Sequence, residues 1–284
     1  MLGFATVRAA ALATFAIVLV ASCSANVLVG VDPCSPDTAT CGLVHRYTFD
    51  GVGTTVLDSV GGAHGTVVGA SLSGHGTLTL VGLTGADIQY VVLPHGLLRQ
   101  LHDATFEAWI NWAGSAAHDG TRTAWQRIFD FGEGTSGIEG EQASKGDALS
   151  YVFVTPQSAP RTAGEVPSTR VAYQVPHDPQ SSSLETVVNA SPLHIDVDTQ
   201  VGVVIDSGAQ RMSLFVNGAI VGSTALAQSD PLSYVYDVND WLGRSQFSSD
   251  GGFSGTYLDF RIYSIALTDD RIRASYDAGP DRVP

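Results

Sequence analysis

The sequence has 284 residues, a formal net charge of −14 and a hydrophobic fraction of 44%. It contains one lysine, Lys145, so it lacks the clustered cations that a phosphate backbone requires, and we exclude nucleic acid as a partner. A chain this acidic is also not attracted to an anionic membrane surface. Its length fits one large β-sandwich preceded by a short leader.

Residues 1–22 have the pattern of a secretory signal. Arg8 is their only charge, and the apolar run at 9–21 is shorter than the roughly 20 residues needed to cross a bilayer core. The run ends in Leu-Val-Ala-Ser before Cys23, which resembles the lipobox of bacterial lipoproteins, where cleavage precedes a cysteine that becomes acylated. We therefore expect Cys23 to be lipidated, and the protein to be exported and anchored to a bacterial membrane through that lipid alone. The alternative is an ordinary signal peptide that contains a cysteine.

The cysteine count agrees with this interpretation. The chain has three cysteines, and an odd number in an exported protein requires a separate role for one of them. With Cys23 lipidated, Cys34 and Cys41 remain as a pair within residues 23–42, a Pro-, Asp- and Thr-containing tether. A disulfide between them would close a short loop in an oxidising compartment and stabilise the chain modestly. A zinc site is the alternative, but no second Cys or His pair stands at zinc spacing.

From residue 43 to residue 284 the chain carries short segments with the two-residue periodicity of β-strands. The clearest is 105–112, which places Phe106, Ile110 and Trp112 on one face and polar residues with Trp109 on the other. We find no pattern for a long helix. Strands are predicted at 43–49, 66–68, 77–80, 90–93, 105–112, 127–132, 149–155, 171–175, 184–188, 201–206, 211–216 and 257–263.

Two local signals refine this pattern. Asn217-Gly218 between apolar strands predicts a tight hairpin, because both turn positions require positive φ. In the final strand, Leu258 and Ile262 are expected on the buried face, with Tyr257 on the opposite face. Thr268 then predicts the N-cap of one brief helix.

Six blocks carry a family resemblance: residues 47–50, Asp58 with the turn at 61–65, 105–109, 126–132, 214–218 and the C-terminal stretch from Trp241. Together they resemble the laminin-G-like, concanavalin A-like jelly-roll family in its bacterial form, over roughly residues 43–279. The resemblance implies an all-β fold, a two-sheet antiparallel jelly-roll sandwich with one short C-terminal helix. It also implies binding of glycans or proteins at loops, often with calcium.

A calcium site is the chemistry that this resemblance suggests. It places Asp50 and Asp58, after the first strand, at one edge with Asp259 of the last strand. Calcium takes six to eight hard oxygen ligands, which carboxylates and carbonyls supply. The alternative is structural: Asp50 and Asp58 hold their own turns, and Asp259 pairs with Arg46 or Arg261.

The tryptophans are candidates for sugar stacking, because an exposed indole offers a flat amphipathic face. Trp125 and Trp241 are expected at loop edges and are the predicted ligand-binding residues. Trp109 and Trp112 are expected in the core.

Two Arg–Asp pairs, Arg127 with Asp130 and Arg244 with Asp240, are predicted to fix loops at the surface. Such surface pairs contribute about 0–1 kcal/mol.

Catalytic motifs are missing from the sequence. Sandwich glycosidases need two convergent carboxylates, and the closest array, Glu139-Gly140-Glu141, lies in a glycine-rich loop. The sequence therefore favours a non-catalytic binding module for a glycan or an extracellular protein. The alternatives are a glycoside hydrolase of concanavalin-like fold and a passive structural or adhesive surface protein.

Overall fold

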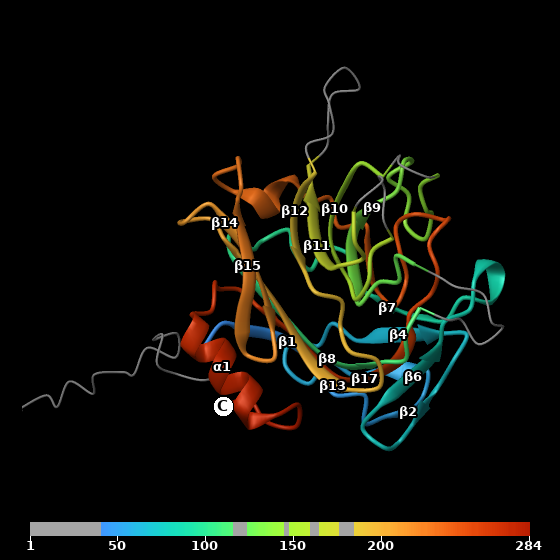
Figure 1. The fold of residues 1–284 in the computed structure, drawn as a ribbon. Coiled ribbons are helices and arrows are strands. Elements are labelled where there is room, and N and C mark those ends of the chain that lie inside the picture. Colours follow the sequence, from blue (N-terminus) through green and yellow to red (C-terminus); the bar gives the residue numbers. More distant parts are fainter. Residues whose placement is uncertain (1–40, 116–123, 145–147, 160–164, 176–184) are drawn as a thin grey trace, which may run out of the picture.

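The structure is a computed structural model that describes residues 41–115, 124–144, 148–159, 165–175 and 185–284. Two antiparallel sheets stack face to face and enclose the core, and one α-helix lies on the outer side of one sheet (Figure 1). The predicted all-β jelly-roll sandwich with a short C-terminal helix is confirmed. Within the described ranges, no helix is long and apolar enough to cross a membrane.

The first sheet has seven strands in the order β1-β17-β8-β13-β14-β15, with β6 also paired to β17. The first and last strands are therefore neighbours, as expected from the resemblance. The strands are β1 (Leu43–Tyr47), β6 (Leu78–Val81), β8 (Ala104–Trp112), β13 (Asp198–Asp206), β14 (Arg211–Val216), β15 (Ala219–Ala225) and β17 (Ser254–Tyr263).

The second sheet has eight strands in the order β12-β11-β10-β9-β16-β7-β4-β3. A two-stranded ribbon and two 3-10 turns complete the fold. The bounds are β3 (Thr55–Val56), β4 (Gly65–Val68), β7 (Tyr90–Leu93), β9 (Phe129–Glu133), β10 (Ser150–Thr155), β11 (Thr169–Gln174), β12 (Thr186–Ala190), β16 (Asn239–Leu242), the ribbon β2 (Val52–Gly53) with β5 (Leu72–Ser73), η1 (Gly85–Asp87) and η2 (Pro231–Tyr234).

Aromatic side chains from both sheets fill the core. Phe106 of β8 stacks on Phe129 of β9 with ring centroids 4.9 Å apart, and Phe131 meets Phe260 edge to face at 6.1 Å. Trp112 is buried on the same face of β8 as Phe106, as the alternation predicted. Burial of each such ring stabilises the fold by about 1.5–3 kcal/mol.

The Asn217-Gly218 hairpin between β14 and β15 is confirmed, with φ of 52° and 73° at the two residues. The prediction for β17 is wrong at two positions, Tyr257 and Leu258. A bulge at Leu258 shifts the register between Tyr257 and Asp259, which places Tyr257 in the core and leaves Leu258 half-buried. One extra residue in a bulged strand has this effect on alternation.

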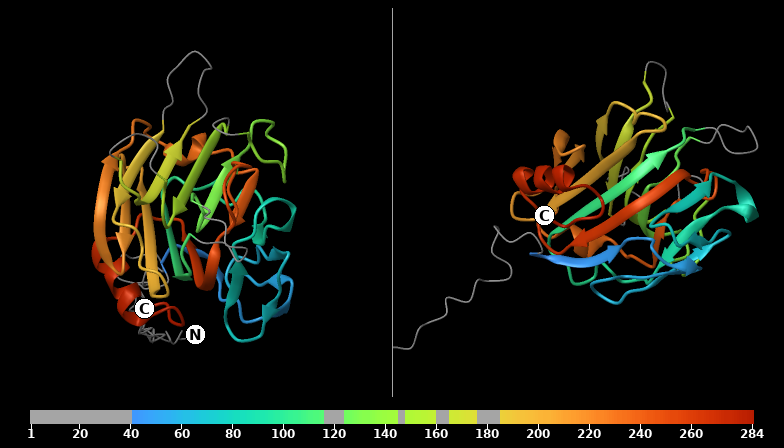
Figure 2. Two further views of the ribbon diagram at one scale, coloured as in Figure 1. Left: turned by 45° about the vertical axis from the view of Figure 1, so that its right-hand side comes forward. Right: turned by 90° about the horizontal axis from the view of Figure 1, so that it is seen from below.

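The helix α1 (Asp269–Ala278) covers the outer face of the seven-stranded sheet (Figure 2). It starts directly after Thr268, as predicted, although the Thr268 hydroxyl makes no capping hydrogen bond. Below it, Arg261 donates to Asp259 at 2.7 Å, and the Tyr276 ring stacks on Trp109 at 5.8 Å. The helix therefore covers the part of this face that carries Trp109 and Arg261, and an open pocket of about 380 Å³ lies beside its first turn, between β13, β14 and Thr268.

Candidate functional site

One continuous row of side chains crosses the face of the eight-stranded sheet that points away from the core. Cross-strand partners share a face, so the pairings of Val92 with Trp241, Trp241 with Asp130, and Asp130 with Phe153 define this row. We name this surface the loop-covered face, because residues 134–144 and 243–250 lie against it. From β4 to β11 the row reads Thr66, Val92, Trp241, Asp130, Phe153 and Ala172.

The β10–β11 half of the loop-covered face is roofed by a second, smaller apolar core. Tyr151 and Phe153 pack there against loop residues Ala143 and Ala148. Phe247, from the other covering segment, meets the Tyr151 ring edge to face at 5.6 Å and forms a β-bridge with Ala143. This half of the face is occupied by the protein's own side chains.

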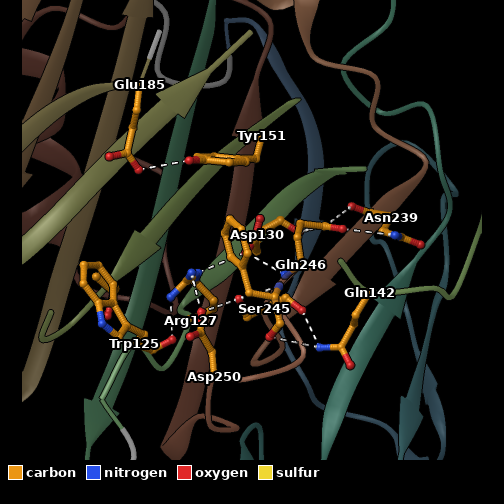
Figure 3. Close-up of polar contacts among 12 residues, drawn as sticks. Trp125, Arg127, Asp130, Gln142, Tyr151, Glu185, Asn239, Ser245, Gln246 and Asp250 are labelled. Carbon is orange, nitrogen blue, oxygen red and sulfur yellow. Dashed lines mark hydrogen bonds and ion pairs between the residues drawn. The ribbon is translucent and has the colours of Figure 1, made fainter. Parts of the chain in front are cut away.

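Arg127 fastens the covering segments through a buried polar network (Figure 3). Its guanidinium donates to Asp130 at 3.0 Å and to Asp250 at 2.8 Å, and it lies 3.8 Å from the centre of the Phe153 ring. The Gln246 backbone N–H also donates to the Asp130 carboxylate, at 3.0 Å. The predicted Arg127–Asp130 pair is therefore present, but it is buried, and the expectation of a surface pair is wrong.

The pKa of Asp130 is raised by this environment. Burial raises it to about 7, although Arg127 and the Gln246 amide act in the opposite direction. One carboxylate oxygen, Oδ1, is buried with no hydrogen-bond partner. Asp130 therefore changes its charge near neutral pH.

The predicted pair between Arg244 and Asp240 is wrong. Asp240 lies opposite Leu93 and Phe131, on the core-facing side of β16. Arg244 lies on the loop-covered face, where its guanidinium is 4.3 Å from the centre of the Trp241 ring and donates to the Tyr90 hydroxyl. The strand ends at Leu242, and Gly243 at φ 85° breaks the alternation, so Arg244 does not continue on the face of Asp240.

A pocket of about 300 Å³ opens between β7 and β16 on the loop-covered face. Tyr90 and Trp241 form one side, edge to face with ring centroids 6.0 Å apart. The Gly140 amide donates to Asn239 at 2.7 Å, and this hydrogen bond fixes the loop that carries the exposed Glu139. Glu139, Gly140 and Asn239 belong to the lining together with both rings. Flat apolar rings beside hydrogen-bonding groups are the usual composition of a small-ligand site.

The two predicted ligand-binding tryptophans lie in different surroundings. Trp241 lines the pocket but is 1% exposed and lies within β16 rather than at a loop edge. Trp125 lies in a turn at φ 63°, half-buried, with Arg170 at 5.2 Å from its ring centre. Trp109 and Trp112 are buried, as expected. Ligand binding by Trp125 and Trp241 stays a prediction.

Sequence analysis did not select Tyr90, Glu139 or Asn239 for this pocket. One signal was available: β7 is apolar or aromatic on both faces, since Tyr90 and Val92 alternate with Val91 and Leu93. A strand with two such faces is covered on both sides. No sequence pattern marks Glu139 and Asn239; they reach the pocket beside β7 only because of how the chain folds.

Asp58 holds the turn that follows β1. Its carboxylate accepts backbone N–H bonds from Val60 and Gly61 at 3.0 Å and contacts His45 Nδ1 at 2.7 Å. Burial acts to raise the pKa of Asp58, but the hydrogen bonds, including one from the Arg46 amide, outweigh it and lower the pKa to about 2.

Asp259 and Asp50 complete the predicted calcium set. Asp259 pairs with Arg46 at 2.8 Å and Arg261 at 2.7 Å, while Asp50 is exposed. Among the described residues, no three His, Cys, Asp or Glu side chains gather as metal ligands. Calcium binding by Asp50, Asp58 and Asp259 stays a prediction.

The lipidation and disulfide predictions lie outside the described residues. Cys23 and Cys34 belong to residues 1–40, and Cys41 is buried at the start of the described chain. Lipidation of Cys23 and the Cys34–Cys41 bond therefore remain predictions.

The family of the chain follows from comparison with known proteins. Residues 85–273 match the concanavalin A-like lectin/glucanases superfamily, and the chain belongs to it. No curated protein sequence matches the chain.

Solved structures resemble the fold at low sequence identity. Domain 4 of AbnA, a GH43 extracellular arabinanase from Geobacillus stearothermophilus solved with arabinotriose, matches with a TM-score of 0.52 at 18% identity, over 82% of this chain and 97% of that one. The binding domain of botulinum neurotoxin DC, solved with rat synaptotagmin II, matches with a TM-score of 0.52 at 13% identity, over 84% of this chain and 52% of that one. Both share the fold.

Proposed function

We propose that the protein is an exported, lipid-anchored module that binds a glycan through the pocket between β7 and β16 and does not cleave it. The pocket is the observation that carries this proposal. The half-buried Tyr90 supplies apolar ring surface next to the Trp241 ring, and Glu139 supplies an exposed carboxylate acceptor beside it. A sugar has the complementary surface, with apolar C–H faces and hydroxyl donors. The AbnA domain, of the same fold, was solved with a glycan, which supports this ligand class.

The arrangement of carboxylates supports binding rather than hydrolysis. Glycoside hydrolysis needs two carboxyl groups that converge on the scissile bond, about 5–5.5 Å apart in retaining enzymes. Of the two acidic residues that line the pocket, Glu139 is exposed on a loop, and Asp240 belongs to the core-facing side of β16. The two groups thus belong to opposite sides of the sheet.

A glycan array followed by titration of the best ligand tests the proposal. Trp241→Phe shrinks the ring in the pocket and should weaken binding at least about fivefold, which corresponds to about 1 kcal/mol. Trp109→Phe is the matched control, because Trp109 is equally enclosed but packs under α1. It should bind like the unaltered protein.

Three results would contradict the proposal: no glycan bound, equal affinity of both variants, or sugar released from the bound glycan. Release of sugar would favour the hydrolase alternative. A protein ligand without any glycan would favour the adhesive one.

A further inference from the structure

We infer that the pocket takes one uncharged sugar residue at the end of a glycan, and not an internal segment or an acidic sugar. This inference rests on the proposed function. It follows from where the pocket is closed, where it is open, and which charges surround it.

The pocket is closed on the β9 side. Asn239 donates to the Glu141 carbonyl at 3.1 Å and to Gln246 at 3.1 Å, which joins both covering segments to β16 at this wall. Beyond the wall, the next residue of the row, Asp130, is fully buried. A sugar chain therefore cannot continue across β9 and β10, where a long groove would run.

The pocket is open on the β4 side. Val92, in the lining, pairs with Thr66, which is exposed, and Tyr90 pairs with Val68, which is 36% exposed. The side chain of Thr55 on β3 is exposed as well. The remainder of a bound glycan can leave in this direction but not across the β9 wall, so the pocket holds its terminal residue.

The volume of the pocket agrees with one residue. At about 300 Å³ it lies at the lower limit of ligand cavities, which range over about 300–1,000 Å³. A chain of several sugars would extend into solvent beyond it.

The charges in the pocket favour an uncharged sugar. Among the described residues, no Lys, Arg or His lines it, and Glu139 is exposed there. The nearest cation, Arg244, donates to the Tyr90 hydroxyl at 2.8 Å and to Gln142 at 3.0 Å. Arg244 is half-buried against the Tyr90 and Trp241 rings, at 4.5 and 4.3 Å from their centres, whereas Glu139 is the exposed charge of the lining and repels a uronate or sialate carboxylate.

The first test asks whether affinity depends on the length of the glycan. The purified full chain is titrated with oligosaccharides of increasing length, all built from the sugar that binds on the array. The monosaccharide, disaccharide, trisaccharide and hexasaccharide should bind with dissociation constants within about threefold of one another. A cyclic oligosaccharide of the same residue, which has no chain end, should not bind. An affinity that rises tenfold or more with length, or binding of the cyclic ligand, would overturn the inference.

A charge variant tests the second requirement. Glu139→Arg replaces the repelling carboxylate with an exposed cation in the lining and should give binding of the acidic counterpart, the uronate of the same sugar, which the unaltered protein should not bind. Asp281→Arg makes the same charge change at an exposed site near the C-terminus and should leave the uronate unbound. Uronate binding by the unaltered protein, or no gain in Glu139→Arg, would refute an uncharged ligand. If the unaltered protein binds no sugar at all, the proposed function itself is refuted.

Discussion

The guanidinium of Arg127 stacks over the Phe153 ring at 3.8 Å while it pairs with Asp130 and Asp250. One buried cation thus joins a strand of the eight-stranded sheet to the segment that covers it. Arg127 and Asp130 are both buried, so removal of the guanidinium would leave the Asp130 carboxylate without a counter-charge.

Arg127→Ala should lower the free energy of unfolding by about 3–5 kcal/mol, the cost of an uncompensated buried charge. Urea denaturation measures this change. The control is Arg273→Ala, which breaks an exposed i,i+4 pair with Asp277 and should cost about 0.5 kcal/mol or less. Equal losses in the two variants would show that the Arg127 network adds nothing beyond a surface pair.

Asp130 should make stability fall as pH rises toward neutral. Its pKa is about 7 in the folded protein and near 4 in an unfolded chain, so the folded state binds the proton more tightly. That contribution is complete below about pH 4 and is lost as pH rises through 7. Asp130→Asn should reduce the decline in the urea midpoint between pH 5 and pH 8.

The decline should not vanish, because burial also raises the pKa of Glu107 to about 7. Asp281→Asn, at an exposed site, should retain the full slope. A slope in Asp130→Asn equal to that of the unaltered protein would mean that Asp130 is already ionised at pH 5.

Asp259→Asn separates the two roles considered for that carboxylate. It leaves the buried Arg261 without its closest partner, so the melting temperature should fall by the same amount in calcium and in chelator. Thermal melts of both proteins in the two buffers measure this. A calcium-dependent rise in melting temperature that the variant lacks would support the calcium hypothesis instead.

Lipidation of Cys23 is tested by Cys23→Ala expressed in a bacterium. The unaltered chain should enter the detergent phase and incorporate a labelled fatty acid, and the variant should do neither. Identical partitioning of the two chains would favour the ordinary signal peptide.

Alternation and turn chemistry were sufficient to predict most of the sandwich. Residues 90–93 and 211–216 form strands with the predicted bounds, and Asn217-Gly218 turns as expected. The bulge at Leu258 was not predictable, because an extra residue leaves the same apolar composition in the strand.

The candidate site was less predictable, because it depends on which strands become neighbours. β16 lies between β7 and β9, and this order brings Trp241 beside Val92 and Asp130, which are distant in the chain. Local sequence does not encode that order. The same reason explains why Arg244 meets Tyr90 rather than Asp240.

The pairing of β1 with β17 has a consequence for the order of folding. Tyr47 lies opposite Phe260, and their rings pack at 6.3 Å, so this edge of the core joins the two ends of the domain. Pairing β1 with β17 requires closing a loop of almost the whole domain, and such long-range contacts form slowly. A chain still threaded through a ribosome or a translocation channel lacks β17, and it cannot complete this sheet until nearly all of it has emerged.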